Sequence, residues 1–386
     1  MIVDIGPVAH GGHCVARAEG RVIFVRHALP GERVRIEITD RRAKFWRADA
    51  VEILEPSPDR VEAPCRFAGR CGGCDFQHAD PRAQLDLKTA VLREQLTRLG
   101  GLSADEVAGF AVEALPGGAL GWRTRVQYAV DRTGRAGLRE HHSHRVVHID
   151  ECVIADERVR SAGLLRQRWR GSNVLGVVAG DADELSVYTQ RDRRGQSRMV
   201  SGPRAVTQTV QGRQFTLDAD AFWQVHPAAA DTLSRVVADL ATPGAGQTIW
   251  DLYAGAGLFA AALAPGVGDS GTVVAVESDR RGRAADNLAD LPRAEVRYGD
   301  VAALLSELPD PDTVVADPPR TGLGADLVDA LAAADPRTLI YVACDPAALA
   351  RDLKSLASHE YRLTALRAFD AFPMTHHFET VARFER

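Results

Sequence analysis

Residues 339–346 of the chain read Leu-Ile-Tyr-Val-Ala-Cys-Asp-Pro, an apolar run that ends in a cysteine and a turn signal. The β-branched and aromatic residues of this run predict a buried strand over 339–343, and Asp345-Pro346 predicts a loop after it. Because open α/β sheets gather their chemistry at the carboxyl ends of parallel strands, Cys344 is a candidate reactive group. The alternative is a small buried core residue, which describes most free cysteines.

From about residue 206 onward the chain alternates strands with helices, which predicts a doubly wound parallel sheet. A glycine loop, Asp-Leu-Tyr-Ala-Gly-Ala-Gly at 251–257, follows one expected strand, and its glycines let the backbone approach a ligand closely. Glu277 ends the next strand, twenty residues after Gly257, where an acid can bind ribose hydroxyls. The pattern predicts a cofactor that contains adenosine, and it leaves both NAD and a purely structural loop open.

Two more acidic residues, Asp317 and Glu379, lie next to expected strands. Asp317 opens Asp-Pro-Pro-Arg at 317–320, a rigid platform whose Arg320 suits a phosphate or a carboxylate. Two prolines that merely end a strand are the alternative. Glu379 lies in an apolar stretch near the end of the chain and can act as a general base if it faces the same cleft as Cys344. The alternative is a salt-bridged strand residue.

Residues 1–56 alternate apolar and polar positions, with turns every eight to twelve residues. This spacing predicts a small all-β sandwich or barrel. The segment Arg-Arg-Ala-Lys-Phe-Trp-Arg at 41–47 mixes basic and aromatic side chains, as surfaces that track a nucleic-acid backbone and stack on bases do. A solvated hairpin would have much the same composition.

The six cysteines include a Cys-x5-Cys-x2-Cys triplet at Cys65, Cys71 and Cys74, spaced for a soft metal. Zinc would accept three thiolates and a fourth ligand, whereas an iron–sulfur cluster would need four thiolates. Cys152 is the natural fourth ligand, because Cys14 lies in a different domain. No apolar run of eighteen residues and no secretory signal appear, so we expect a cytoplasmic protein without a membrane span.

These motifs occur together in one order, and in that order the chain resembles the RNA 5-methyluridine methyltransferases that depend on S-adenosylmethionine. The resemblance covers nearly the whole chain and is to the iron–sulfur kind that acts on 23S ribosomal RNA. It implies an α/β class I methyltransferase with a doubly wound, Rossmann-like sheet. The implied domains are an RNA-binding TRAM β-barrel at 1–56, a β-rich central domain with a 4Fe-4S cluster at 57–205, and the methyltransferase domain at 206–386.

The resemblance also implies roles for individual residues. Cys344 would be the nucleophile that attacks uracil C6, and Glu379 the base that removes the C5 proton. The remaining implied residues are the cofactor contacts Gln224, Tyr253, Glu277 and Asp317, and the cluster ligands Cys65, Cys71, Cys74 and Cys152. Three positions depart from the family pattern without removing a reacting group, namely His226, Asp345 and Phe378.

The expected partner is RNA, with no obligate protein partner evident in the sequence. We expect a local group or hydrogen bond to favour the Cys344 thiolate, and the target uridine to flip out of the RNA fold. Three alternatives stay open: the same chemistry on transfer RNA, a zinc-stabilised RNA-binding protein with a non-catalytic methyltransferase fold, and a radical iron–sulfur enzyme with a TRAM domain. The radical enzyme would need Cys-x3-Cys-x2-Cys spacing, which this triplet lacks.

Overall fold

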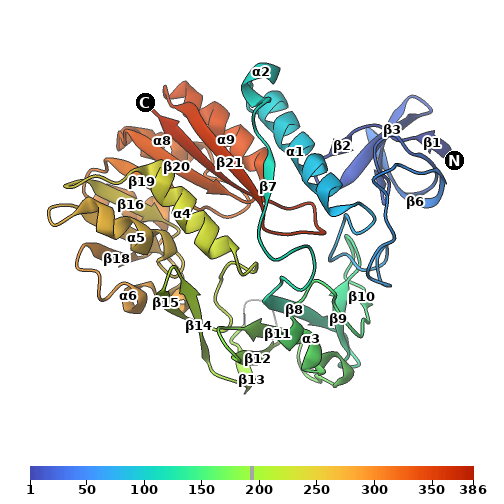
Figure 1. The fold of residues 1–386 in the computed structure, drawn as a ribbon, viewed down its shortest axis with the longest axis horizontal. Helices are drawn as coiled ribbons and strands as arrows, with labels where there is room; N and C mark the ends of the chain where they lie inside the picture. Colours follow the sequence, from blue (N-terminus) through green and yellow to red (C-terminus); the bar gives the residue numbers. More distant parts are fainter. Residues whose placement is uncertain (192–194) are drawn as a thin grey trace.

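The computed structural model describes residues 1–191 and 195–386, and the strands in these ranges form four sheets. Figure 1 shows the amino-terminal sheet and the large carboxyl-terminal sheet on opposite sides of the molecule, with helix α1 between them. In the described ranges, no helix is both long enough and apolar enough to cross a membrane.

The amino-terminal sheet has six strands in the order β1-β5-β6-β4-β3-β2. Along β5 the buried Val34 and Ile36 alternate with exposed polar residues, which is the period-two pattern that the sequence predicts. The β-rich unit expected at the start of the chain is therefore present. Its strands are β1 (Ile2–Asp4), β2 (Val8–Ala9), β3 (His13–Ala18), β4 (Arg21–Arg26), β5 (Arg33–Arg41) and β6 (Phe45–Glu55).

The central sheet is antiparallel and has the order β10-β9-β8-β11-β12-β13. A separate two-stranded hairpin, β14 and β15, leads from it toward the carboxyl-terminal sheet. The strands are β8 (Arg125–Val130), β9 (Ala136–Arg139), β10 (Val146–Val147), β11 (Val174–Ala179), β12 (Leu185–Gln190), β13 (Arg198–Ser201), β14 (Ala205–Val210) and β15 (Arg213–Asp218). The short helices beside this sheet are α3 (Glu157–Ser161) and η1 (Leu164–Arg166).

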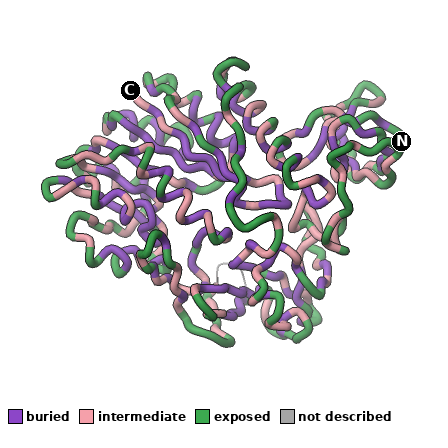
Figure 2. Tube along the Cα trace, viewed as in Figure 1, coloured by how far each residue is buried: buried purple, intermediate pink, exposed green. Residues whose placement is uncertain are grey.

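The large sheet has eight strands in the order β18-β17-β16-β19-β20-β22-β21-β7. Its first five strands run parallel, as expected, whereas β22 is antiparallel to both of its neighbours. Figure 2 shows the inner strands of this sheet as almost continuously buried. The strands of the sheet that follow the central sheet in sequence are β16 (Thr248–Leu252), β17 (Thr272–Glu277), β18 (Ala294–Tyr298), β19 (Thr313–Ala316), β20 (Thr338–Ala343), β21 (Arg362–Asp370) and β22 (Glu379–Glu385).

Helices cover this sheet, and α4 and α9 are the longest that follow the central sheet. The apolar faces of α5 and α8 also enter the core of the sheet, where Leu263 and Val328 are fully buried. The helices are α4 (Ala229–Ala241), α5 (Leu258–Leu263), η2 (Ala264–Val267), η3 (Arg280–Gly282), α6 (Ala284–Asn287), α7 (Val301–Leu304), η4 (Leu305–Glu307), α8 (Ala325–Ala333) and α9 (Pro346–Ser358).

One segment from the first half of the chain belongs to the large sheet. Helix α1 (Pro81–Arg98) packs against α9, and after the short helix α2 (Ala104–Val107) the strand β7 (Val112–Ala114) pairs in parallel with β21. The sequence grouped these residues with the central unit. Helical periodicity identifies α1 but does not identify its packing partner, so this long-range docking appears only in the structure.

Candidate active site

A cleft of about 950 Å³ lies at the carboxyl ends of the parallel strands, where the sequence predicts a site. Every residue proposed from the sequence for catalysis or for cofactor binding lines this one cleft. They are Gln224, Tyr253, Glu277, Asp317, Cys344 and Glu379.

Cys344 and Glu379 are neighbours across two paired strands. In the antiparallel pairing of β20 with β22, Ala343 lies opposite Thr380, so Cys344, directly after β20, faces Glu379, the first residue of β22. The Thr380 hydroxyl donates a hydrogen bond to the Ala343 carbonyl at 2.9 Å and fixes this register. The thiol and the carboxyl group therefore share one end of the cleft.

The charges around this pair act against ionisation. Burial, reinforced by the negative charges of Glu379 and Asp317, raises the pKa of the Cys344 thiol to about 12, and Arg320 opposes the shift. Burial and Asp317 likewise raise the pKa of Glu379 well above its ordinary value, again against Arg320. The sequence predicts a group that favours the thiolate, and in this structure Arg320 acts in that direction but is outweighed.

The glycine loop and Glu277 form a compact cradle. One Glu277 carboxylate oxygen accepts a hydrogen bond from the Gly255 backbone N–H at 2.7 Å, and the other accepts one from the Asp279 N–H at 2.6 Å. Tyr253 and Gly257 adopt positive φ angles of 63° and 85°, the left-handed conformation for which glycine is best suited. This geometry brings the backbone of the glycine loop close to the Glu277 carboxylate.

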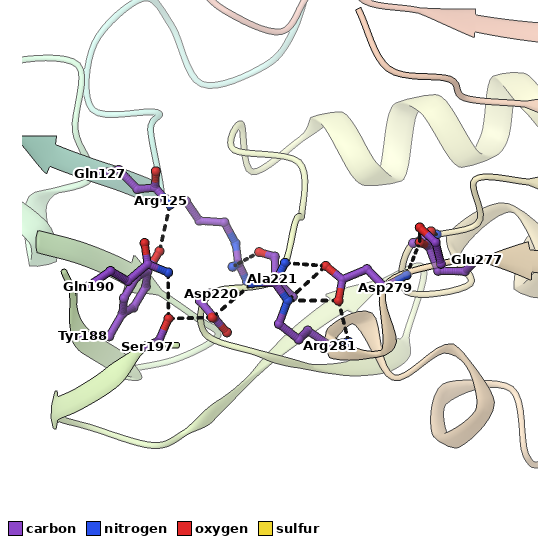
Figure 3. Close-up of polar contacts among 12 residues, drawn as sticks. Arg125, Gln127, Tyr188, Gln190, Ser197, Asp220, Ala221, Glu277, Asp279 and Arg281 are labelled. Carbon is purple, nitrogen blue, oxygen red and sulfur yellow. Dashed lines mark hydrogen bonds and ion pairs between the residues drawn. The ribbon is translucent and has the colours of Figure 1, made fainter. Parts of the chain in front are cut away.

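A chain of polar contacts joins this cradle to the loop that carries Gln224 (Figure 3). Arg281 pairs with Asp279, two residues beyond Glu277, and also with Asp220 at 3.2 Å. Arg125, on β8 of the central sheet, donates to the carbonyls of Ala219 and Ala221, each at 3.1 Å. These two arginines hold the 219–224 loop against the cofactor side of the cleft. Sequence reasoning missed both, since nothing local marks them.

The segment before Glu379 is held by helix α1. Lys88 is fully buried, and its ammonium group contacts the Asp370 carboxylate at 2.6 Å and the Phe372 carbonyl at 3.1 Å. Gln84, one turn earlier, accepts a hydrogen bond from the Met374 N–H at 2.8 Å. A lysine among the apolar positions of a helix was the available signal for this role.

Each of the three positions that depart from the family pattern is held by packing or by hydrogen bonds in the structure. His226 is buried, stacks on Trp122 with ring centroids 5.9 Å apart, and accepts a hydrogen bond from the Ala228 N–H at 3.2 Å. Asp345 is the N-cap of α9, and its side chain accepts hydrogen bonds from two backbone N–H groups of the first turn. Phe378 is fully buried in the core beneath the large sheet.

The four cysteines proposed as metal ligands come together beside the cleft, because Gly73 and Leu138 line both the cleft and the cavity that these cysteines surround. Cys65, Cys71, Cys74 and Cys152 line a small cavity of about 20 Å³ whose other walls are mostly apolar. Burial raises the pKa of Cys71 to about 11 and also raises that of Cys152. Within residues 1–191 and 195–386, however, no group of three or more His, Cys, Asp or Glu side chains has the spacing of a formed metal site. The structure therefore shows convergence of the thiols without coordination geometry.

The glycines of the cysteine motif explain how the chain fits there. A Cβ on Gly72 would lie 2.7 Å from the His141 backbone nitrogen and 2.9 Å from the Arg139 carbonyl oxygen. A Cβ on Gly73 would lie 3.5 Å from the Cys71 sulfur. Gly72 is thus required for the close approach of this segment to the 139–141 turn.

Comparison with known proteins agrees with this arrangement. The TRAM domain family matches residues 1–51, and the family described as tRNA (Uracil-5-)-methyltransferase matches residues 305–386. An uncharacterized RNA methyltransferase of Streptomyces avermitilis is 46% identical over 99% of this chain and 97% of its own length. One of Bifidobacterium longum is 36% identical over 100% of this chain and 96% of its own length.

A solved structure shares the whole fold. It is the tRNA (uracil-54, C5)-methyltransferase of Pyrococcus abyssi in complex with S-adenosyl-L-homocysteine, with a TM-score of 0.75 and 24% identity over the full length of both chains. Identities of 46% and 36% across nearly whole chains establish the family. The chain belongs to the RNA methyltransferases and combines an amino-terminal TRAM domain with a carboxyl-terminal region of the tRNA (uracil-5-)-methyltransferase family.

Proposed function

We propose that this protein methylates C5 of uridine in RNA, with S-adenosylmethionine as the methyl donor and 23S ribosomal RNA as the substrate. The observation that carries the proposal is the pairing of Cys344 with Glu379 at the end of two adjacent strands, inside the cleft that also contains Glu277. A thiol next to a buried carboxyl group is the pair of groups that C5 methylation requires.

The cofactor would be held on the side of the glycine loop. Glu277 would bind the ribose hydroxyls, Tyr253 would face the cofactor from the loop, and Gln224 and Asp317 would complete the contacts toward the reacting end. All four line the cleft. When bound, S-adenosylmethionine supplies an electrophilic methyl group.

The protein's own groups make C5 reactive and then restore the base. The Cys344 thiolate adds to C6, and the C5=C6 electron pair moves to C5, which becomes nucleophilic. After C5 has been methylated, Glu379 takes the proton from C5. The electron pair of that C–H bond re-forms the double bond, the S–C6 bond breaks, and Cys344 leaves as the thiolate. Arg320 would stabilise negative charge at both side chains, because it lowers both pKa values.

RNA would approach along a basic groove beside the cleft. A second cavity of about 500 Å³ lies between the amino-terminal and central sheets and is lined by Arg26, Arg42, Arg47, Arg70 and Arg145 among others. It shares Glu140, His141 and His142 with the main cleft. The nearby aromatic rings carry arginines above them, with Arg41 4.8 Å and Arg21 5.3 Å from the Trp46 ring centroid. This combination of arginines and aromatic rings suits contacts with RNA phosphates and stacking on bases.

We further propose that the four cysteines bind a 4Fe-4S cluster. Four thiols around one small apolar cavity make a donor set that suits a soft metal centre. The methyl transfer consumes no electron, so the cluster would support the structure or the RNA path. The cavity walls reach Leu138, next to the 139–142 turn that lines both the cleft and the basic groove.

Transfer RNA is the second candidate substrate, because both the matched carboxyl-terminal family and the Pyrococcus abyssi structure carry tRNA in their descriptions. Purified protein should be incubated with methyl-labelled S-adenosylmethionine and unmodified transcripts of each RNA, and the labelled nucleoside identified. We expect 5-methyluridine in the 23S transcript. Glu379→Gln should form a protein–RNA adduct that survives denaturing gels, because C5 proton removal would fail after addition. Label in neither RNA would contradict the proposal.

A further inference from the structure

The turn between β2 and β3 brings the amino-terminal sheet into contact with the loop that follows Cys344. It reads His-Gly-Gly-His at 10–13, and both glycines have positive φ angles. The His10 Nε2 atom lies 3.2 Å from the Asp345 carboxylate. Asp345 follows Cys344 directly, so a residue of the TRAM domain contacts the loop of the proposed nucleophile.

The second contact of this turn is with the segment before Glu379. A Cβ on Gly12 would lie 3.0 Å from the Asp75 Cβ and 3.1 Å from the His376 Cβ, so only glycine packs there without displacing either residue. Asp75 in turn accepts hydrogen bonds from the His376 N–H at 3.0 Å and from its ring Nδ1 at 2.6 Å. The turn thus lies at a junction of the nucleophile loop, the base segment and the chain just after Cys74.

Asp345 has a second role that makes its position matter. Its other carboxylate oxygen accepts hydrogen bonds from the backbone N–H groups of Ala347 at 3.0 Å and Ala348 at 2.8 Å, which caps α9. Burial alone would raise the pKa of Asp345, but the hydrogen bonds from His10 and from the helix lower it to about 2. One carboxylate therefore links the TRAM turn, the first turn of α9 and the backbone of Cys344.

We propose that His10 is a positioning residue, which through Asp345 holds the loop of Cys344 in its reactive conformation. Docking of the TRAM domain is thereby coupled to catalysis. This inference rests on the proposed function. The TRAM domain then contributes to the chemical step as well as to RNA binding. Loss of the contact lowers kcat and leaves the RNA-binding face of the domain intact.

Kinetics on the 23S transcript test this coupling in the full-length protein. His10→Ala removes the donor, and Asp345→Asn keeps a capping oxygen but removes the carboxylate that His10 contacts. Each should lower kcat about fivefold, the size expected for a partly exposed pair, with little change in KM for RNA. The double variant should lose no more than either single variant. His10→Gln, whose amide nitrogen can reach the position of Nε2, should recover most of the rate.

The matched control is Arg35→Gln, which breaks the exposed Arg35–Glu52 pair in the same sheet and should behave as the wild type. Additive losses, or a raised KM with unchanged kcat, would overturn the proposal. A readout without RNA separates it from the proposed function: the alkylation rate of Cys344 by iodoacetamide, followed by peptide mass spectrometry. His10→Ala and Asp345→Asn should change this rate by the same factor and His10→Gln should restore it. An unchanged rate in both would also overturn it.

Discussion

Cys344 lies in a cleft of about 950 Å³, whereas Cys65, Cys71, Cys74 and Cys152 surround a cavity of about 20 Å³. Burial raises the pKa of thiols in both places. Around Cys344 the neighbours are charged side chains, namely Glu379, Asp317 and Arg320. Around the four cysteines they are mostly apolar side chains and the thiols themselves.

This difference separates two uses of one residue type. A single thiol in a wide cleft has room for a substrate and has a carboxyl group beside it for proton removal. Four thiols around a small, mostly apolar cavity leave no room for a substrate, and a bound cation is what would let them all ionise together. In the proposed function, the same residue type would therefore serve as a transient nucleophile in one region and as a metal ligand in the other.

The strongest test of the comparison removes the single thiol. Cys344→Ala should lower the rate of uridine methylation by at least about 10⁴-fold, because no other group would add to C6. The same variant should keep its iron content. Cys14→Ala is the matched control, since Cys14 is buried in the amino-terminal sheet, where its thiol donates to the Ala28 carbonyl at 3.2 Å. Label transfer is the measurement, and wild-type rates in Cys344→Ala would exclude the covalent mechanism.

Removing one of the four thiols should have the converse result. Cys74→Ala should lose the visible absorption, iron and sulfide of the wild type, and its melting temperature should fall because metal binding contributes to folding. Its Cys344 should still react with iodoacetamide. A colourless wild-type protein that contains stoichiometric zinc would instead support the zinc alternative and contradict the cluster.

Local patterns were enough to single out Cys344 and Glu379 as the proposed reacting pair. The strand that ends at Cys344, the acid that ends β17 and the glycine loop are all marked by residues close in sequence. The register that brings Glu379 beside Cys344 is not local, because β22 returns from the end of the chain and pairs antiparallel to β20. The sequence predicts a base at Glu379 on the condition that it faces the same cleft as Cys344, and in the structure both residues line that cleft.

Local sequence patterns do not identify the residues that hold the site in place. Lys88 lies on α1 and its partner Asp370 lies at the end of β21, 282 residues later. Arg125 lies on β8 and Arg281 lies on η3, and their contacts meet only across the 219–224 loop. The periodicity and composition of the sequence around these residues do not identify their partners, because each contact depends on how the sheets dock. For the same reason, the pairing of β7 with β21 could not be predicted from the local sequence.

The smallest predicted effect is the dependence of the two regions on pH. In the proposed mechanism Glu379 and Cys344 both act in their deprotonated forms, and both pKa values are raised. The methylation rate should therefore fall as pH falls, and alkylation of Cys344 should increase by up to about tenfold per pH unit below its pKa. Arg320→Gln should shift both profiles to higher pH, because this arginine lowers both pKa values.

Arg98→Gln, on the exposed side of α1, should leave both profiles unchanged. The four clustered cysteines should behave differently from Cys344 over the same range. Thiolates bound to a metal are already deprotonated, so their alkylation should stay slow and nearly independent of pH until the metal is lost. If Cys74 in the iron-loaded protein showed the same pH response as Cys344, the two cysteine regions would share one chemistry and the distinction between them would fail.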